Sequence, residues 1–434
     1  MKYYLKNLSR IKTRRVLLEN IGALGAIQIM NYVLPLITFP YLVRVLGPEK
    51  YGLVSFALSF VTYFMIFVDY GFEYSATREV SLSRNNKDRL SEIFSSVMLS
   101  KILLIFLSLL LMSVIVFSFE RFRQDWFLYF MTFSMVIGYA SIPSWFFQGV
   151  ENMKFITISY FVGRLIFVIN VFVFIKSQSD YYLVHFLNSV GLLMCGVILI
   201  ISALTFYGVR LFIPSRYQII QQIEKGRDFF ILSSLTQAYS VSNTLILGLI
   251  SGETYVGYYY AAEKIVNMVL SLLSFPITRA FFPYMSRVAK ESKERGLKIV
   301  RKLSVLVGSI AFFISAILFI SADLIVKILL GDGYSSSINI LRFLSFLVFI
   351  KGLSGVFITQ GLLAFGLKHI VVRIMLIVNI SHIILAVTFT KFFSIFGSVI
   401  SLCITETLLA FLSIKSFMRI ASLPFPNERK KSFS

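Results

Sequence analysis

Long apolar runs recur along the whole chain of 434 residues, and they restrict the fold more than any other feature of the sequence. A transmembrane α-helix needs about 20 apolar residues, because the hydrocarbon layer of a bilayer is roughly 30 Å thick. Between charged or turn-rich breaks there are twelve such runs, at residues 21–43, 51–72, 92–118, 126–147, 155–175, 181–205, 229–250, 256–283, 303–326, 338–365, 370–390 and 394–416. A spanning segment must satisfy its own backbone hydrogen bonds, and these runs lack the alternating polarity of barrel strands. The sequence therefore predicts an all-α integral membrane protein with twelve transmembrane helices.

The distribution of basic residues predicts how these helices are oriented. The net charge is +21, but Lys and Arg lie mostly in short segments between apolar runs, which favours a role in topology over nucleic-acid binding. Alternate inter-helix segments, beginning with the N-terminus, hold 28 Lys and Arg, whereas the opposite segments hold seven. The segments of the group with 28 basic residues are 1–20, 73–91, 148–154, 206–228, 284–302, 366–369 and 415–434. We therefore expect a multi-pass protein with both termini in the cytoplasm.

Short matching motifs in the two halves of the chain indicate an internal repeat. Gly47-Pro-Glu-Lys-Tyr-Gly52 resembles Gly252-Glu-Thr-Tyr-Val-Gly257, and Gln148-Gly149 is matched by Gln360-Gly361. An even number of helices per repeat gives both halves the same orientation, so we expect two pseudo-symmetric six-helix lobes with a substrate site where they face each other. The expected segments are a basic amphipathic segment (1–20), an N-lobe (21–205), a linker (206–228), a C-lobe (229–416) and a tail (417–434).

Motifs for enzymatic or ATP-driven chemistry are absent from the sequence. There is no P-loop, dinucleotide fingerprint, HExxH motif or serine elbow, and no inter-helix segment on the outer side is long enough to form a catalytic domain. Cys195 and Cys403 lie in separate apolar runs, and the three histidines share no ligand spacing. We expect neither a metal nor a cofactor, and we do not expect an enzyme.

Basic residues inside the apolar runs are the candidates for substrate binding. A basic residue at the centre of a transmembrane helix raises the free energy of membrane insertion by about 2.5–3.5 kcal/mol, so its side chain usually faces a cavity or an acidic partner. Arg164, Lys264 and Lys351 lie deepest and are the main candidates, with Arg342 near the outer end of its span and Arg44 at the outer mouth of the first. The remaining three basic residues in the runs are Lys101, Arg279 and Arg373. They lie near the cytoplasmic ends of their spans, and we expect their side chains to extend to the lipid headgroups.

Acidic residues within or next to the runs are fewer. Glu263, Glu406 and Asp69 are candidates for carrying a coupling ion, and a structural ion pair is the alternative for Asp69 and Glu406. Glu263 and Lys264 are sequence neighbours, so they do not face each other on a helix. The excess of basic residues in the runs favours an anionic cargo over a cationic one.

Four segments of the sequence resemble one family of transporters. They are Pro35-Leu-Ile-Thr-Phe-Pro-Tyr-Leu-Val-Arg-Val-Leu-Gly-Pro-Glu-Lys-Tyr-Gly52, Asp69-Tyr-Gly-Phe-Glu-Tyr-Ser-Ala-Thr-Arg-Glu79, Pro143-Ser-Trp-Phe-Phe-Gln-Gly-Val-Glu-Asn-Met153 and Gln360-Gly-Leu-Leu-Ala-Phe-Gly366. These segments are similar to those of Wzx-type flippases, the polysaccharide transport branch of the multidrug/oligosaccharidyl-lipid/polysaccharide exporter superfamily. The resemblance extends over most of the chain, but the basic and acidic candidates above cannot be assigned from it.

The resemblance implies a flippase that moves an undecaprenyl-diphosphate-linked oligosaccharide, such as an O-antigen unit, from the cytoplasmic to the periplasmic leaflet by alternating access. It also implies a place in the bacterial inner membrane and glycan-assembly partners such as a polymerase. Two alternatives remain open. A MATE-like antiporter of small molecules or cations would have the same fold. An integral-membrane glycan polymerase or ligase is disfavoured, because such enzymes carry a long periplasmic loop and this sequence has no long segment on the outer side.

Overall fold

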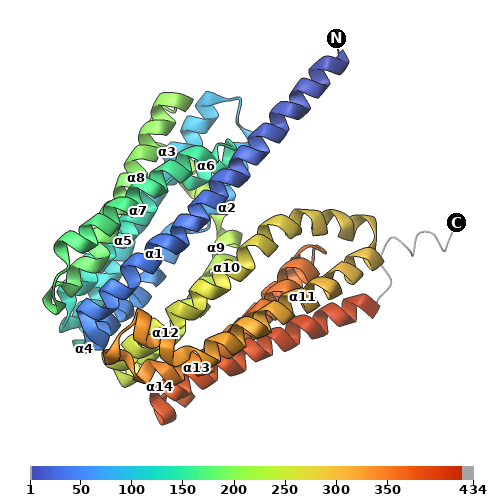
Figure 1. The fold of residues 1–434 in the computed structure, drawn as a ribbon. Helices are drawn as coiled ribbons and strands as arrows, with labels where there is room; N and C mark the ends of the chain where they lie inside the picture. The colour runs from blue at the N-terminus through green and yellow to red at the C-terminus, as the bar shows by residue number, and fades with distance from the viewer. Residues whose placement is uncertain (1, 423–434) are drawn as a thin grey trace. The chain divides into compact units, whose positions relative to one another are not determined.

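A computed structural model describes the backbone of residues 2–422 (Figure 1). Side chains are described throughout this range except at residues 2–33, 35, 232, 274–280, 283, 290 and 420–422. Residues 2–422 are almost entirely helical and contain no strand, which confirms the all-α prediction. The predicted amphipathicity of residues 1–20 and most of the predicted tail lie outside the described residues.

Tertiary contacts divide the chain into two compact units. The first unit comprises residues up to Leu46 together with Val54–Val241, and the second comprises Gly47–Leu53 together with residues from Ser242 onward. The seven residues Gly47–Leu53 come from the first half of the sequence, yet they pack in the second unit. The predicted lobe and linker boundaries remain a proposal.

The first unit contains most of the chain's short helices. Its elements are α1 (Lys2–Asp69), α2 (Phe72–Leu82), α3 (Lys87–Ser118), α4 (Glu120–Arg123), α5 (Trp126–Ala140), α6 (Ser144–Gly149), α7 (Met153–Phe174), the 3-10 turn η1 (Gln178–Tyr182), α8 (Leu183–Tyr207) and the larger part of α9 (Arg216–Ser251). The helices α7 and α8 pack closely where Gly163 and Gly191 face each other. A Cβ on either glycine would overlap the carbonyl oxygen of the other, so only glycine permits this approach.

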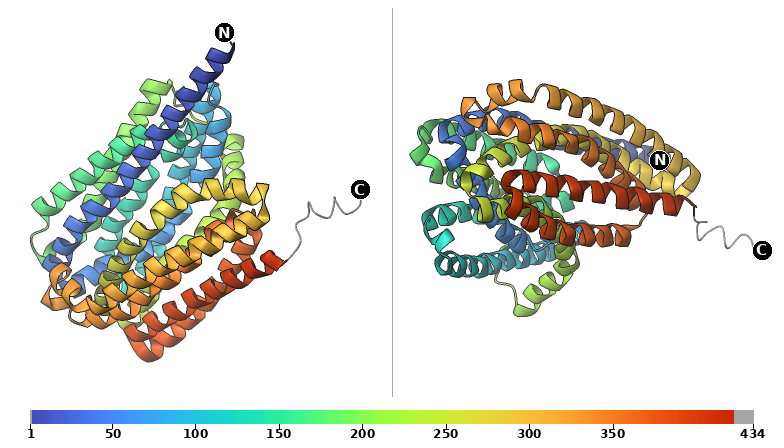
Figure 2. Two further views of the ribbon diagram at one scale, coloured as in Figure 1. Left: turned by 45° about the vertical axis from the view of Figure 1, so that its right-hand side comes forward. Right: turned by 90° about the horizontal axis from the view of Figure 1, so that it is seen from below.

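The second unit contains fewer and longer helices, which run alongside one another in both views of Figure 2. Its elements are α10 (Glu253–Glu291), α11 (Lys293–Ile320), α12 (Ala322–Leu329), the 3-10 turn η2 (Asp332–Tyr334), α13 (Ser336–Gly355), the π-helix η3 (Val356–Leu363) and α14 (Lys368–Ser422). The family-like segment 360–366 begins inside η3. Single π-helical turns are rare and occur frequently at functional sites.

Two of the long helices are interrupted by a single non-helical residue. In α1 this residue is Gly47 (φ 70°, ψ 172°), and in α14 it is Ser394 (φ 51°, ψ −129°). By length and composition, eight helical stretches of the described residues could cross a membrane, and two of the eight contain these breaks: Leu36–Leu82 and Lys368–Arg419. The break at Gly47 lies between the first two predicted spans, and the break at Ser394 coincides with the first residue of the last predicted span. The full count of twelve remains a prediction.

The repeated glycine motifs adopt the same conformation. Gly47 and Gly252 both have positive φ, at 70° and 98°, where side-chain-bearing residues are strained. Each is followed by a helix that carries the second motif glycine, Gly52 or Gly257. The sequence repeat is therefore a structural repeat: a left-handed glycine that ends one helix and starts the next.

Within the second unit these two motifs pack directly against each other. A Cβ on Gly52 would overlap the carbonyl oxygen of Glu253, and a Cβ on Gly257 would overlap that of Pro48. Glu253 and Pro48 are equivalent positions of the repeat, so each glycine meets the other motif in the same way. Both contacts are to backbone atoms, and neither can move aside as a flexible side chain would.

Candidate functional site

Three helices of the second unit bring together four deep charges. The Nζ of Lys351 on α13 lies 3.1 Å from the Oε1 of Glu406 on α14. Glu406 is almost fully buried, with 2% of its surface exposed. On α10, Tyr259 and Glu263 are one turn apart, and the Tyr259 hydroxyl donates a hydrogen bond of 3.0 Å to the Glu263 carboxylate. Glu263 also interacts electrostatically with Lys351, Lys264 and Glu406.

The composition of this cluster limits what it can do. It holds two carboxylates and two ammonium groups, so its formal charges cancel. A buried carboxylate is costly unless it is paired, and Lys351 supplies that partner for Glu406. Any anion that binds Lys351 must therefore compete with Glu406. The predicted roles of Lys264 and Lys351 in substrate binding and of Glu263 and Glu406 in ion coupling remain predictions.

Arg164 is one of the deep basic residues of the first unit. Its Nε is buried and has no hydrogen-bond partner among the described residues. The side chain lies within electrostatic reach of Tyr139 on α5 and of Tyr160 and Cys195. Arg164 follows Gly163, so the glycine contact between α7 and α8 determines where its backbone is held. The predicted role of Arg164 in substrate binding remains a prediction.

The prediction for Lys101 is wrong. We expected its ammonium to reach the headgroups, but Lys101 is 3% exposed and its Nζ lies 3.8 Å from the Oδ1 of Asp69. The side chain points into the helix bundle, where Asp69 at the end of α1 offsets its charge. Depth along a helix, which the sequence indicates, does not determine the face to which a side chain points.

Two of the family-like segments meet in the first unit, at Glu73 on α2. Ser144 Oγ donates a hydrogen bond of 2.8 Å to its carboxylate, and Gln148 Nε2 donates another. Thr77 Oγ1 also donates to the carbonyl oxygen of Trp145, at 3.2 Å. Sequence reasoning placed Glu73 in a loop and missed this role. The co-occurrence of the two segments in one family was the signal that could have indicated their contact.

The other basic residues named from the sequence differ in their exposure. Arg342 is half-buried, and its Nη1 lies 3.4 Å from the Oδ1 of Asn339 on the same helix. Arg44 is exposed, as is Arg373. The side chain of Arg279 lies outside the described residues.

A bundle of long apolar helices with paired charges deep inside it has the architecture of a multi-pass membrane transporter. Two solved structures of transporters share the fold. "Lipid II flippase MurJ, inward closed conformation" aligns with a TM-score of 0.74 at 14% identity, covering 94% of this chain and 88% of its own. An inward-facing multidrug resistance MATE family transporter of the MOP superfamily aligns with a TM-score of 0.66 at 13% identity, covering 93% and 98%.

Sequence comparison identifies the family. The profile of the family described as "Polysaccharide biosynthesis protein" matches residues 17–289. The "Putative O-antigen transporter" of Escherichia coli strain K12 is 31% identical over 94% of this chain and 97% of its own length. A protein of the same description from Shigella dysenteriae is 27% identical over 92% and 99%. The chain belongs to the polysaccharide biosynthesis protein family, and the resemblance inferred from the four sequence segments is confirmed.

Proposed function

We propose that this chain is a flippase that carries an undecaprenyl-diphosphate-linked oligosaccharide, such as an O-antigen repeat unit, from the cytoplasmic to the periplasmic leaflet. The observation that carries the proposal is the similarity, over almost the full length, to two proteins described as O-antigen transporters. The fold shared with a lipid II flippase supports it. The protein relocates its substrate without converting it. We place it in the bacterial inner membrane with both termini cytoplasmic, next to glycan-assembly proteins such as a polymerase.

The physical task is to move a charged headgroup across hydrocarbon while its polyprenyl tail stays in lipid. A bare diphosphate cannot enter a medium of low dielectric at tolerable cost. Basic side chains that form charge-assisted hydrogen bonds lower this cost. Outward movement of an anion is also favoured in an inside-negative membrane, by about 2.3 kcal/mol per charge per 100 mV. Alternating access by two lobes would expose the headgroup to one side at a time.

Each unit offers one basic residue suited to this task. Arg164 of the first unit has a buried Nε without a hydrogen-bond partner among the described residues. Lys351 of the second unit is held by Glu406, at 3.1 Å. A diphosphate that took Lys351 from Glu406 would leave that carboxylate without its partner and ready to accept a proton or a cation. This exchange would couple substrate binding to ion binding; Glu263 and Asp69 are further coupling candidates, and Lys264, Arg342 and Arg44 further binding candidates.

The function is tested in a host that assembles lipid-linked oligosaccharide but lacks its own flippase. We expect the chain to restore surface glycan and to remove the precursor that accumulates in the cytoplasmic leaflet. Efflux of cationic dyes without restored glycan would instead support the MATE-like alternative. A change in glycan chain length with unchanged leaflet distribution would support a polymerase.

Arg164→Gln is expected to reduce flipping at matched protein levels. Hydrogen bonds to charged groups contribute about 1.5–3 kcal/mol, and about 1.4 kcal/mol corresponds to a tenfold change, so we expect a loss of at least about tenfold. The accumulated precursor is measured by extraction and accessibility to a glycan-specific probe. Arg373→Gln, which neutralises an exposed arginine of α14, serves as the control. Equal activity of both variants would show that Arg164 does not bind the substrate.

A further inference from the structure

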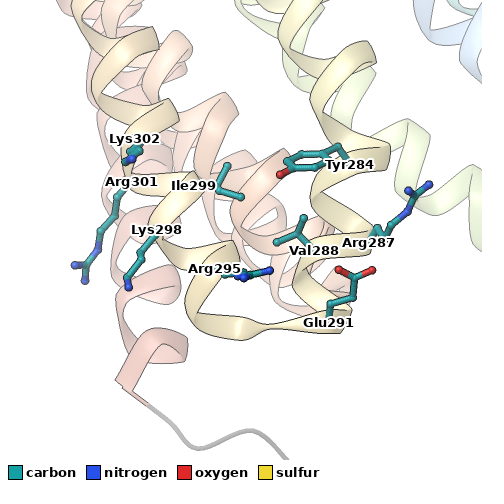
Figure 3. A pocket seen from close by; sticks show the side chains of 9 residues that line it. All are labelled: Tyr284, Arg287, Val288, Glu291, Arg295, Lys298, Ile299, Arg301 and Lys302. Carbon is teal, nitrogen blue, oxygen red and sulfur yellow. The ribbon is translucent and has the colours of Figure 1, made fainter.

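The turn between α10 and α11 forms a hollow of about 660 Å³ within the second unit (Figure 3). Only Ser292 separates the two helices, and its side chain accepts a hydrogen bond from the backbone N–H of Arg295, which caps α11. The chain therefore reverses within one residue. The last turns of α10 and the first turns of α11 lie opposite each other, with the hollow between them.

Helical spacing determines which side chains line the facing surfaces. On α10, Tyr284, Val288 and Glu291 are four and three residues apart, so they share one face. On α11, the matching row is Arg295, Ile299 and Lys302. Figure 3 shows the two rows in opposite order: Glu291 near Arg295 by the turn, then Val288 near Ile299, then Tyr284 toward Lys302.

The hollow combines an apolar centre with a basic surround. Val288 is 8% exposed and forms the centre with the half-buried Ile299. Five of the nine lining residues are basic, and Glu291 is the single acid among them. Arg287 and the outer residues Lys298 and Arg301 add positive charge on either side of the facing rows. All five basic side chains are exposed, so their combined positive potential attracts anions from solution to the hollow.

The position of the hollow along the chain indicates which kind of anion it would bind. The hollow lies in residues 284–302, between two predicted spans, and this segment holds seven Lys and Arg, more than any other segment between spans. In the predicted topology it lies at the headgroup layer of the cytoplasmic leaflet. Topology alone requires positive charge in the segment, but it does not require the charge to surround an apolar hollow. A soluble phosphate would gain nothing from Val288 and Ile299, whereas the first carbons of a lipid chain would.

We propose that this hollow binds the phosphate or diphosphate headgroup of a lipid in the cytoplasmic leaflet, with the start of the alkyl or prenyl chain over Val288 and Ile299. Arg295 and Lys302 flank the apolar centre and contact the headgroup. The carried lipid and the bulk anionic phospholipids share this chemistry. The first source would make the hollow a loading site that rests on the proposed function; the second would make it an anchor that does not.

Binding is tested on the purified full chain in nanodiscs of phosphatidylcholine. The probes are undecaprenyl diphosphate, phosphatidylglycerol and inorganic pyrophosphate, each titrated into the parent and into Arg295→Gln/Lys302→Gln. The control, Arg216→Gln/Arg227→Gln, removes the same charge from exposed residues of α9. We expect the first double variant to weaken lipid binding at least about tenfold, because two charge-assisted hydrogen bonds are lost, and the control to change it less than about twofold. Thermal unfolding of all three proteins checks that the variants fold.

The outcomes separate the possible sources. Preference for undecaprenyl diphosphate over phosphatidylglycerol assigns the hollow to the carried lipid, and equal binding assigns it to bulk phospholipid. Equal weakening by both double variants, or pyrophosphate binding as tight as lipid binding, would overturn the proposal. A parent chain that binds lipid in this way but does not restore surface glycan would disprove the proposed function alone.

Discussion

Gly257→Ala is expected to destabilise the protein strongly, although it adds only one methyl group. The new Cβ would overlap the carbonyl oxygen of Pro48 and lie 2.7 Å from its carbonyl carbon, whereas non-bonded carbons pack at about 3.5–4.0 Å. Both obstructing atoms belong to the backbone, so relief requires the two segments to separate. Overpacking of this kind costs typically about 1–3 kcal/mol and occasionally more, and the rigid backbone on both sides puts this site at the upper end.

Gly52→Ala tests the same contact from the equivalent position, where the Cβ would overlap the carbonyl oxygen of Glu253. Because both variants force apart the same two segments, the double variant should cost less than the two single losses added together. The measurement is thermal unfolding in detergent. Gly355→Ala is the matched control: this glycine is helical, and a Cβ there would meet nothing within 4 Å. A Gly257→Ala protein as stable as the control would contradict the packing described for the motifs.

Glu406→Gln is expected to be the second severe change, because it removes the carboxylate nearest to the Lys351 ammonium. Breaking a buried ion pair from one side costs about 3–5 kcal/mol when the remaining charge is not compensated. Because the Lys351 side chain is 27% exposed and also interacts with Glu263, we expect a cost at the lower end of this range. Asp323 and Lys327 on α12 form a pair at the same distance of 3.1 Å, but both side chains are about half exposed. Asp323→Asn should therefore cost only about 0.2–1 kcal/mol. Unfolding of the two variants under the same conditions gives the comparison.

The double variant Lys351→Met/Glu406→Met distinguishes support of the fold from substrate binding. Two apolar side chains of similar length remove both charges at once, and such replacements are often neutral or stabilising. We expect unfolding stability close to that of the parent together with a loss of flipping, because the ammonium that would bind diphosphate is gone. Full flipping by this variant would show that the pair is structural and that Lys351 does not bind the substrate.

Long apolar runs were enough to predict the all-α membrane fold, and the motifs in the sequence were enough to predict the family. The pairing of Lys351 with Glu406 was not predictable, because these residues are 55 positions apart on different helices and their side-chain directions depend on packing. The same limit explains the error at Lys101. The glycine repeat was visible in the sequence, but only the structure shows that its two copies contact each other. The π-helix η3 has no periodic signal of its own.

The reciprocal glycine contact ties the two copies of the motif to each other. Each copy touches the other through equivalent atoms, as identical surfaces do across a two-fold axis in a homodimer. A side chain at either glycine would displace the backbone of the other copy, so each motif limits what its counterpart can tolerate.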